Sequence, residues 1–289
     1  MIKNGARRIR NVLSQFIHSN NAVFAVIRRL YYYLRYYVLL LKVTLYCIWH
    51  RYPMNKVFLT VPARYLTYTE FDKHGYRAIS SRTKNIHKYL GTVKDGEWDL
   101  NRTPIDDWII YKSLKSYFFD GIDLKDTPYY SEKLDEGRKN GIWYQITSKN
   151  YEKEVQRITH LFKSLKANGY KSQRDLGNPN PLDEIRVKIA RDGTFLWENS
   201  IHRFVIAKLL KLEKITVVVT VRHHDWINLK KKLIELAQKR DGSQINEERN
   251  LRYYHPDLEE IPYCREGEKV IEKHLETQKS ITTKTEVVV

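Results

Sequence analysis

The chain has 289 residues, of which 42% are apolar, so it can fold around one large or two modest hydrophobic cores. Its 51 Lys and Arg residues exceed its 34 Asp and Glu residues, which leaves a formal net charge of +17. This charge indicates polyanionic partners, such as nucleic acid, anionic lipid or a phosphorylated ligand. The two cysteines, Cys47 and Cys264, lack metal-type spacing, which excludes zinc-finger and disulfide-rich classes and favours a reduced, cytoplasmic setting.

The positive charge is concentrated at the start of the chain. Eleven Lys or Arg residues precede Glu70, and no Asp or Glu does. Arginines also interrupt the apolar runs near the N-terminus, so no secretory signal is expected there. Residues 1–52 are therefore expected to form a basic region of their own.

Residues 22–49 contain neither Pro nor Gly and predict one long helix. Arg28, Arg35 and Lys42 recur every seven residues, within about 20° of two full helical turns, so they form one narrow basic stripe. No uncharged run approaches the roughly 18 residues of a transmembrane span. The helix is expected either to lie on a membrane surface or to pack on the domain or on a second copy of the chain.

Between residues 53 and 170 the sequence predicts one strand and three helices. The last of these helices has the clearest pattern, because Val155, Ile158 and Leu165 share one face and Gly169 follows as a stop signal. The expected elements are a strand at 56–62 and helices at 106–120 (capped by Asp106 or Asp107), 128–140 and 150–168.

A β-hairpin is predicted over residues 185–197. Apolar and polar residues alternate over 185–189, as in a half-buried strand. Asp192-Gly193 is a signal for a two-residue turn, and residues 195–197 then form the returning strand.

A helix and a central strand are predicted after the hairpin. Asn199 or Ser200 would supply the N-cap of a buried helix over 201–212. Residues 215–221 are apolar and β-branched, which predicts a strand in the middle of a sheet and, with the preceding strand and helix, a right-handed crossover. A basic amphipathic helix is expected over 227–240.

The start of the helix at residue 201 has the properties of an anion site. Free backbone N–H groups and the positive end of the helix dipole point outward there. Arg203 adds a bidentate fork, and His202 adds a titratable donor. On the local pattern alone, the alternative is a helix whose first-turn His and Arg merely face solvent.

Four segments carry a resemblance to a known superfamily. They resemble the ParB/sulfiredoxin superfamily, in which a hairpin precedes a helix that opens with a phosphate-gripping His-Arg or Arg-Arg pair. The resemblance implies an α+β fold, a mixed sheet with surrounding helices, preceded here by the long basic amphipathic helix. The segments are LFKSLKANGYKSQRDL (161–176), EIRVKIARDG (184–193), NSIHRFVIAKLLKL (199–212) and ITVVVTVRHHDW (215–226).

More narrowly, the chain resembles the uncharacterised ParB-like nuclease domain proteins of prokaryotes. Their Gly-Asp-Trp-Asp-like motif, Val-Arg-His-x-x-Trp strand end and His-Pro-Asp-Leu motif are matched at residues 96–99, 221–226 and 255–258. The likeness covers about residues 56–262 and is strongest over 155–226, so the basic N-terminal helix lies outside it.

Local chemistry and the resemblance together assign a candidate site. A nucleotide with Mg²⁺ is the implied cofactor, and no metal site made by the protein itself is predicted. The expected catalytic carboxylates are Glu97, Asp99 and Glu198, and the expected phosphate- or nucleotide-binding residues are Asn199, Ser200, His202, Arg203, Arg222 and His223.

The candidate site departs from the superfamily pattern at three positions. Ser200 replaces a Gly and Asn199 replaces an Asp, while Ile201 stands where sulfiredoxins have their catalytic Cys. The last departure excludes sulfinic-acid reductase activity, because the reaction needs that thiol.

Three other polar clusters have simpler expected roles. His223 and His224 should leave their strand on opposite faces, so only one of them would face the site. His255-Pro256-Asp257 is expected to be a rigid turn, and Lys230 to Lys232 a solvated face.

The expected organisation is a basic helical region (1–52), a ParB/sulfiredoxin-like domain (53–263, core 155–226) and a charged, flexible tail (264–289). The first function hypothesis is binding of a nucleotide or other phosphorylated ligand, with phosphoryl transfer or nucleotide hydrolysis as the reaction if the protein is an enzyme. The alternatives are a DNA-binding or nuclease-like protein and a membrane-associated scaffold with a degenerate site.

Overall fold

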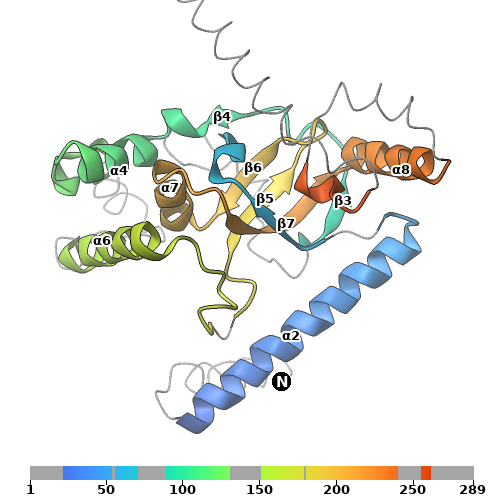
Figure 1. The fold of residues 1–289 in the computed structure, drawn as a ribbon, viewed down its shortest axis with the longest axis horizontal. Coiled ribbons are helices and arrows are strands. Elements are labelled where there is room, and N and C mark those ends of the chain that lie inside the picture. Colours follow the sequence, from blue (N-terminus) through green and yellow to red (C-terminus); the bar gives the residue numbers. More distant parts are fainter. Residues whose placement is uncertain are drawn as a thin grey trace, which may run out of the picture.

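The computed structural model describes residues 22–53, 56–70, 89–130, 151–178, 180–239 and 255–261. Three expectations lie wholly or partly outside these ranges: the basic region before residue 22, the helix at 128–140, of which only residues 128–130 are described and are helical, and the tail after residue 263. The described part is a mixed α/β structure with one mixed sheet, several helices around it and a long N-terminal helix (Figure 1).

The sheet is built around one central strand, as the apolar run at 215–221 predicts. The strand order is β1-β7-β5-β6-β2-β4, and β3 pairs with the end of β7. β3 and β5 run parallel to β7, whereas β1 runs antiparallel to it. The strands are β1 (Phe58–Val61), β2 (Tyr68–Thr69), β3 (Thr92–Lys94), β4 (Thr103–Pro104), β5 (Ile185–Ile189), β6 (Phe195–Asn199) and β7 (Ile215–His223).

Helices cover both faces of the sheet. In Figure 1, α4, α6 and α7 gather on one side, α8 lies at the opposite end, and α2 lies alone along the lower side of the sheet. The helices are α2 (Ala22–Trp49), α4 (Ile109–Phe119), α6 (Tyr151–Asn168), α7 (Ile201–Leu209) and α8 (His224–Gln238), with 3-10 turns η1 (Ala63–Tyr65), η3 (Ile105–Asp107), η4 (Leu124–Asp126) and η5 (Pro256–Leu258).

β7 is buried on both of its faces. Val217 and Val219 belong to the main core, which includes apolar residues of α4, α6 and α7. Val218 points the other way, into a second cluster formed with α2. The residues of α2 in this second cluster are Tyr36, Leu39, Val43 and Cys47, all of them buried. The packing of α2 on the domain is therefore part of the fold.

The helix expectations are confirmed in type but not at every boundary. α6 ends at Asn168, where Gly169 takes a positive φ of 67° and donates its N–H to Leu165. α4 begins only at Ile109, so its expected caps, Asp106 and Asp107, lie in η3 instead. The acidic residues just before the apolar run predicted a helix cap, but the chain forms a 3-10 turn there before the helix begins.

α7 and α8 also differ from expectation. α7 ends at Leu209, three residues earlier than predicted, and α8 begins at His224, three residues earlier. Ser200 is the N-cap residue of α7, but its hydroxyl caps nothing: it adopts a left-handed φ of 68° and donates to the Glu184 carbonyl. The expected side-chain cap is therefore wrong, because the hydroxyl is used to hold a neighbouring loop.

The hairpin is confirmed with a longer turn than predicted. Ala190 and Thr194 close the turn, so it contains three residues and not two. Gly193 has a φ of 85°, and a Cβ there would lie 2.5 Å from the Trp226 ring, so both backbone and packing require glycine.

The expected crossover is also corrected. β6 runs antiparallel to β5, and β5 lies between β6 and β7, so the strands flanking α7 are neither neighbours nor parallel. The parallel connection instead runs from β5 to β7 and includes β6 and α7. The sequence pattern of strand, helix and strand does not reveal which strand of the hairpin, β5 or β6, lies next to β7.

Candidate functional site

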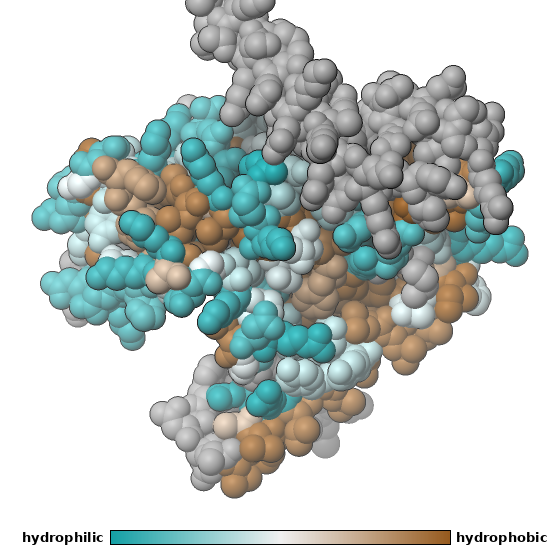
Figure 2. Space-filling view, viewed as in Figure 1, coloured by the Kyte–Doolittle hydropathy of each residue, from teal (hydrophilic) through white to brown (hydrophobic). Residues whose placement is uncertain are grey.

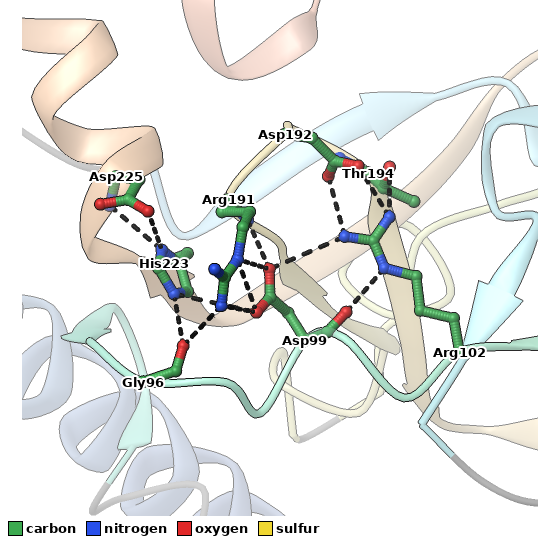
Figure 3. A network of polar contacts seen from close by, with 8 residues as sticks. All are labelled: Gly96, Asp99, Arg102, Arg191, Asp192, Thr194, His223 and Asp225. Atoms are coloured by element: carbon green, nitrogen blue, oxygen red, sulfur yellow. Dashed lines mark hydrogen bonds and ion pairs between the residues drawn. The ribbon is translucent and has the colours of Figure 1, made fainter.

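Three parallel strands, β3, β5 and β7, end at the same edge of the sheet, and polar side chains converge there (Figure 3). The loop after β3 supplies Gly96 and Asp99, the turn after β5 supplies Arg191, and the end of β7 supplies His223. Carboxyl ends of parallel strands are a common position for ligand sites in α/β proteins, so this edge is the first candidate site.

Asp99 is the centre of this network and is fully buried. Its carboxylate accepts hydrogen bonds from the backbone N–H of Arg191 at 2.9 Å and from the Nε and Nη2 atoms of the same side chain at 2.8 to 3.1 Å. Burial acts to raise the pKa of Asp99, but the hydrogen bonds from Arg191 outweigh it, so the pKa lies below its ordinary value. Asp99 is thus a carboxylate saturated by one arginine.

Arg102 extends the network to the other side of the hairpin turn. Its Nε donates to the Asp99 carbonyl at 2.6 Å, and its Nη1 donates to Asp192 at 2.7 Å and to Thr194 at 3.1 Å. Two arginines therefore fasten the segment after β3 to the turn between β5 and β6. We call Asp99, Arg102, Arg191 and Asp192 the Asp99 clamp.

His223 joins the clamp to the start of α8. Its Nε2 lies 2.8 Å from the Gly96 carbonyl, and its Nδ1 accepts the backbone N–H of Asp225 at 3.1 Å, which caps α8. A carbonyl can only accept and an N–H can only donate, so the ring carries its hydrogen on Nε2. His224 points elsewhere and contacts Asn228, which confirms that only one histidine faces this edge.

A second polar group lies on the same side of the sheet, farther from its edge. The Trp98 ring lies 5.7 Å from the His223 ring and 5.4 Å from the Lys188 ammonium. Lys188 is buried and forms an ion pair of 2.6 Å with Glu70. Trp98 therefore separates the clamp from a buried Lys–Glu pair.

Glu198 and Thr220 form a pair in the middle of the sheet. Strand registers shift on both sides of β5, once opposite Glu198 and once opposite Thr220, so each is the extra residue of a β-bulge. The two bulges bring the Thr220 hydroxyl within 2.5 Å of Glu198, and both residues are buried. Glu198 is thus held by the sheet itself.

Arg222 belongs to a different cluster, on the opposite face of the sheet. Its guanidinium donates to fully buried Asp257 at 2.5 and 2.9 Å, and Asp257 also accepts from Trp226 at 2.9 Å. Lys230 lies 3.6 Å from the same carboxylate. Burial acts to raise the pKa of Asp257, but the nearby positive charges, Arg222 first, hold it well below its ordinary range.

This cluster corrects one expectation and confirms another. Lys230 is buried against Asp257, so the predicted solvated face is limited to Lys231 and Lys232. The turn at His255-Pro256-Asp257 is confirmed as η5, and its carboxylate is the counter-ion that attaches η5 to the sheet.

The amino end of β5 holds the remaining predicted phosphate residues. Asn199 accepts the N–H of Ser200 at 2.7 Å, and no side chain caps the first turn of α7. Arg203 donates to the Asp183 carbonyl at 2.5 Å and lies 3.8 Å from Glu184. Arg203 is therefore close to the helix start, but it is shared with two acidic residues.

His202 does not face this helix start. It is buried, with Arg157 Nη2 at 2.9 Å from its Nδ1 and the Tyr129 hydroxyl at 3.3 Å from its Nε2. Burial, reinforced by the charge of Arg157, lowers its pKa to about 4. His202 is then neutral near neutral pH, so its 3.8 Å approach to Glu154 is not an ion pair. His202, predicted as a titratable donor for a phosphate, therefore directs its ring nitrogens at Arg157 and Tyr129.

The structure therefore divides the nine predicted residues among several places. Asp99 and His223 meet at the carboxyl edge, Glu198 lies in mid-sheet, and Arg222 lies on the opposite face. Glu97 is exposed, beside the clamp but not in it. Asn199, Ser200 and Arg203 share the amino end of β5, and His202 faces α6.

The residues that sequence reasoning missed are the partners of the predicted ones. They are Arg191, Arg102, Lys188, Glu70, Asp257 and Lys230. A basic residue directly after a predicted strand, such as Arg191, is a weak signal. Its partner 92 residues away could not be named without the fold.

The carboxyl edge is suited to fastening chain segments together. Asp99 and His223 direct their polar atoms at other protein groups. In the part of the chain that the structure describes, no group of three or more His, Cys, Asp or Glu side chains could hold a metal ion.

No protein-family model, no curated protein and no solved structure matches the chain.

Replacement of Asp99 by Asn tests the clamp. Loss of the charge removes the strongest hydrogen bonds of Arg191, so the free energy of unfolding should fall by about 2–3 kcal/mol. Asp192→Asn is the matched control: it also loses an arginine partner, but Asp192 is half-exposed, so the cost should stay below about 1 kcal/mol. Denaturant unfolding measures both, and equal losses would show that Asp99 has no special role.

Buried histidines predict a loss of stability in acid. Burial lowers the pKa of His255 to about 4, as for His202, whereas each is about 6.5 in the unfolded chain. As pH falls from 6.5 towards 4, only the unfolded chain takes up these protons, so stability decreases. From about pH 7 to pH 5 each histidine should contribute a loss of about 2 kcal/mol. His255→Gln should reduce the loss measured by urea unfolding; an unchanged pH profile contradicts this assignment.

Proposed function

We propose that this protein is a peripheral membrane protein that lies on an anionic lipid surface through α2. One observation carries this proposal: of 17 large apolar side chains that are well exposed in the described part, 12 belong to α2. Figure 2 shows the resulting apolar surface along the side of α2 that is turned away from the sheet. An exposed apolar surface of this extent is typical of an interaction site.

The two faces of α2 are cleanly separated. Leu30, Leu34 and Leu41 are exposed on one face, whereas Leu39 and Val43 are buried against the sheet on the other. Successive residues turn by about 100°, so the exposed residues form one continuous band along the helix axis. Both faces of α2 are therefore apolar: one is buried against the sheet, and the other is exposed.

The basic stripe lies along one border of this band. Arg28, Arg35 and Lys42 lie about 90–130° around the helix from its centre, between the exposed and buried faces. This is the arrangement of an interfacial helix, in which apolar side chains enter the bilayer and basic side chains reach the headgroups. Exposed Tyr31 and Tyr37 add rings suited to the same boundary.

Charge favours a membrane over a second copy of the chain. α2 contains four basic residues and no acidic residue, so two α2 helices packed together would bring like charges close to each other. An anionic surface attracts each basic residue near it by about 1 kcal/mol. In the described part of the chain, α2 included, no helix is long and apolar enough to cross a bilayer, so the proposed contact is with the surface.

Replacement of exposed leucines tests this proposal directly. Leu30→Gln, Leu34→Gln and Leu41→Gln together should weaken binding to vesicles of phosphatidylcholine and phosphatidylglycerol by more than about hundredfold, because each buried leucine contributes about 1.5–3 kcal/mol. These residues are 66%, 67% and 58% exposed, so the fold should be unaffected. Vesicle co-sedimentation of the full chain measures the effect.

The matched control uses exposed apolar residues outside α2. Leu100 and Ile122 are 54% and 44% exposed, so Leu100→Gln with Ile122→Gln should leave vesicle binding unchanged. The opposite outcome is that the unmodified chain fails to bind anionic vesicles and forms dimers that the α2 substitutions dissociate. In that outcome a second copy of the chain covers the apolar band of α2, and the proposal is wrong.

A second candidate function is binding of a phosphorylated ligand by a ParB/sulfiredoxin-type module. We infer it from the resemblance, supported by the order α6, Gly169, β5, β6, α7 and β7, which is the order that the resemblance implies. The observation favouring it is the start of α7, where Ser200 is left-handed, no side chain caps the first turn, and Arg203 lies beside it. If the module is an enzyme, phosphoryl transfer remains the best-supported reaction class.

A thermal-shift screen against nucleotides and sugar phosphates, with and without magnesium, tests this candidate. A ligand that raises the unfolding temperature should lose affinity by about 1.5–3 kcal/mol in Arg203→Gln, the value of a charge-assisted hydrogen bond. Lys163→Gln, an exposed change of equal charge on α6, should have no effect. Equal binding by both variants would remove Arg203 from the site.

A further inference from the structure

Arg186 differs from the other arginines around the sheet. It lies on β5, next to Val218 of β7 on one side and Asn199 of β6 on the other. Its Nε is shielded from solvent and has no hydrogen-bond partner, and no residue in the described ranges forms an ion pair with its guanidinium. A half-buried arginine without an ion-pair partner keeps an uncompensated charge, so an external anion that reaches its Nη atoms, which are not among its shielded atoms, would stabilise it.

Arg186 lies at the border of the α2 contact. Val218, its neighbour in register, packs directly beneath α2, and adjacent strands are only about 4.8 Å apart. Leu182, four residues earlier, belongs to the same cluster. Arg186 thus lies beside the surface that α2 covers.

Arg186 lies on the flank of α2 opposite the basic stripe. Tyr46 is on the same flank of α2 as Arg35 and Lys42, and its hydroxyl contacts Val93 of β3. β3 and β5 lie on opposite sides of β7, so Arg186 borders the other flank. The apolar band of α2 therefore has cations along both borders.

The depth of a surface-bound helix places Arg186 at the level of lipid phosphates. An interfacial helix enters about 5–10 Å below the headgroup boundary, and a helix with its side chains is about 10–12 Å across. With the exposed band of α2 in the bilayer, its sheet-facing side and the residues at its border lie among the headgroups. Arg186 then faces phosphate oxygens.

We propose that Arg186 binds the phosphate group of a membrane lipid when α2 lies on the bilayer. The inference rests on the proposed membrane function and specifies its partner. A phosphate presents two oxygens in the geometry of the arginine fork, which lysine cannot match. The bond would form at the Nη atoms, because Nε is shielded, and would give the Arg186 guanidinium the anionic partner that the described ranges do not supply.

The experiment compares Arg186→Gln, Arg186→Lys and Lys115→Gln in the full chain. Lys115 is exposed on α4, away from α2 in Figure 1, so it matches the charge change of Arg186→Gln without touching the site. Partition onto vesicles of phosphatidylcholine and phosphatidylglycerol should weaken about tenfold or more in both Arg186 variants and stay unchanged in Lys115→Gln. Circular dichroism confirms that each variant is folded.

Each outcome decides the proposal. If Arg186→Lys binds vesicles like the unmodified chain, charge alone acts and phosphate recognition is overturned. If inorganic phosphate stabilises the unmodified chain but not Arg186→Gln in a thermal shift, while both bind vesicles equally, the ligand is a soluble phosphate and the lipid assignment is overturned. If the unmodified chain does not bind vesicles, the membrane function has failed and this inference fails with it; vesicle binding unaffected by any Arg186 change overturns only the inference.

Discussion

Burial of both faces of β7 is the constraint on which the rest of the structure depends. Its apolar, β-branched residues cannot be left in water on either side, so Val217 and Val219 require the helical layer of the main core and Val218 requires α2. A single helix laid across one face, however, buries only one of its own sides. The exposed apolar band of α2 follows directly from this arrangement, and so does its proposed use at a lipid surface.

Charged groups inside the domain act mainly as fasteners between distant segments. Asp99 joins the segment after β3 to the turn after β5, and Asp257 joins η5 to the end of β7. Each carboxylate is paired with arginine, which limits the cost of its burial. The polar groups at the carboxyl edge of the sheet are therefore used in contacts within the chain. The first turn of α7 and Arg186, the groups with hydrogen-bonding capacity for a ligand, both lie at the amino end of β5; α7 belongs to the main core, whereas Arg186 borders the face that α2 covers.

Local patterns predicted much of the fold and little of the site. α2, α6, the hairpin and the central position of β7 were all predicted, because periodicity, glycine positions and β-branched runs act over a few residues. His202 shows the limit of such reasoning. In sequence it stands in the first turn of a helix beside Arg203, but consecutive helix residues point about 100° apart, and packing of α6 against α7 buries one of the two.

The sequence by itself determined the elements, the basic stripe and the lack of acidic residues before Glu70, since these depend only on residue order and helix or strand geometry. Only the tertiary structure decided which side chains meet. Arg191 and Asp99 are 92 residues apart, and Arg222 and Asp257 are 35 apart. It also decided which half of α2 is covered and that Arg186 has no acceptor for Nε. Burial and pairing are properties of segments brought together by packing, and no local pattern encodes them.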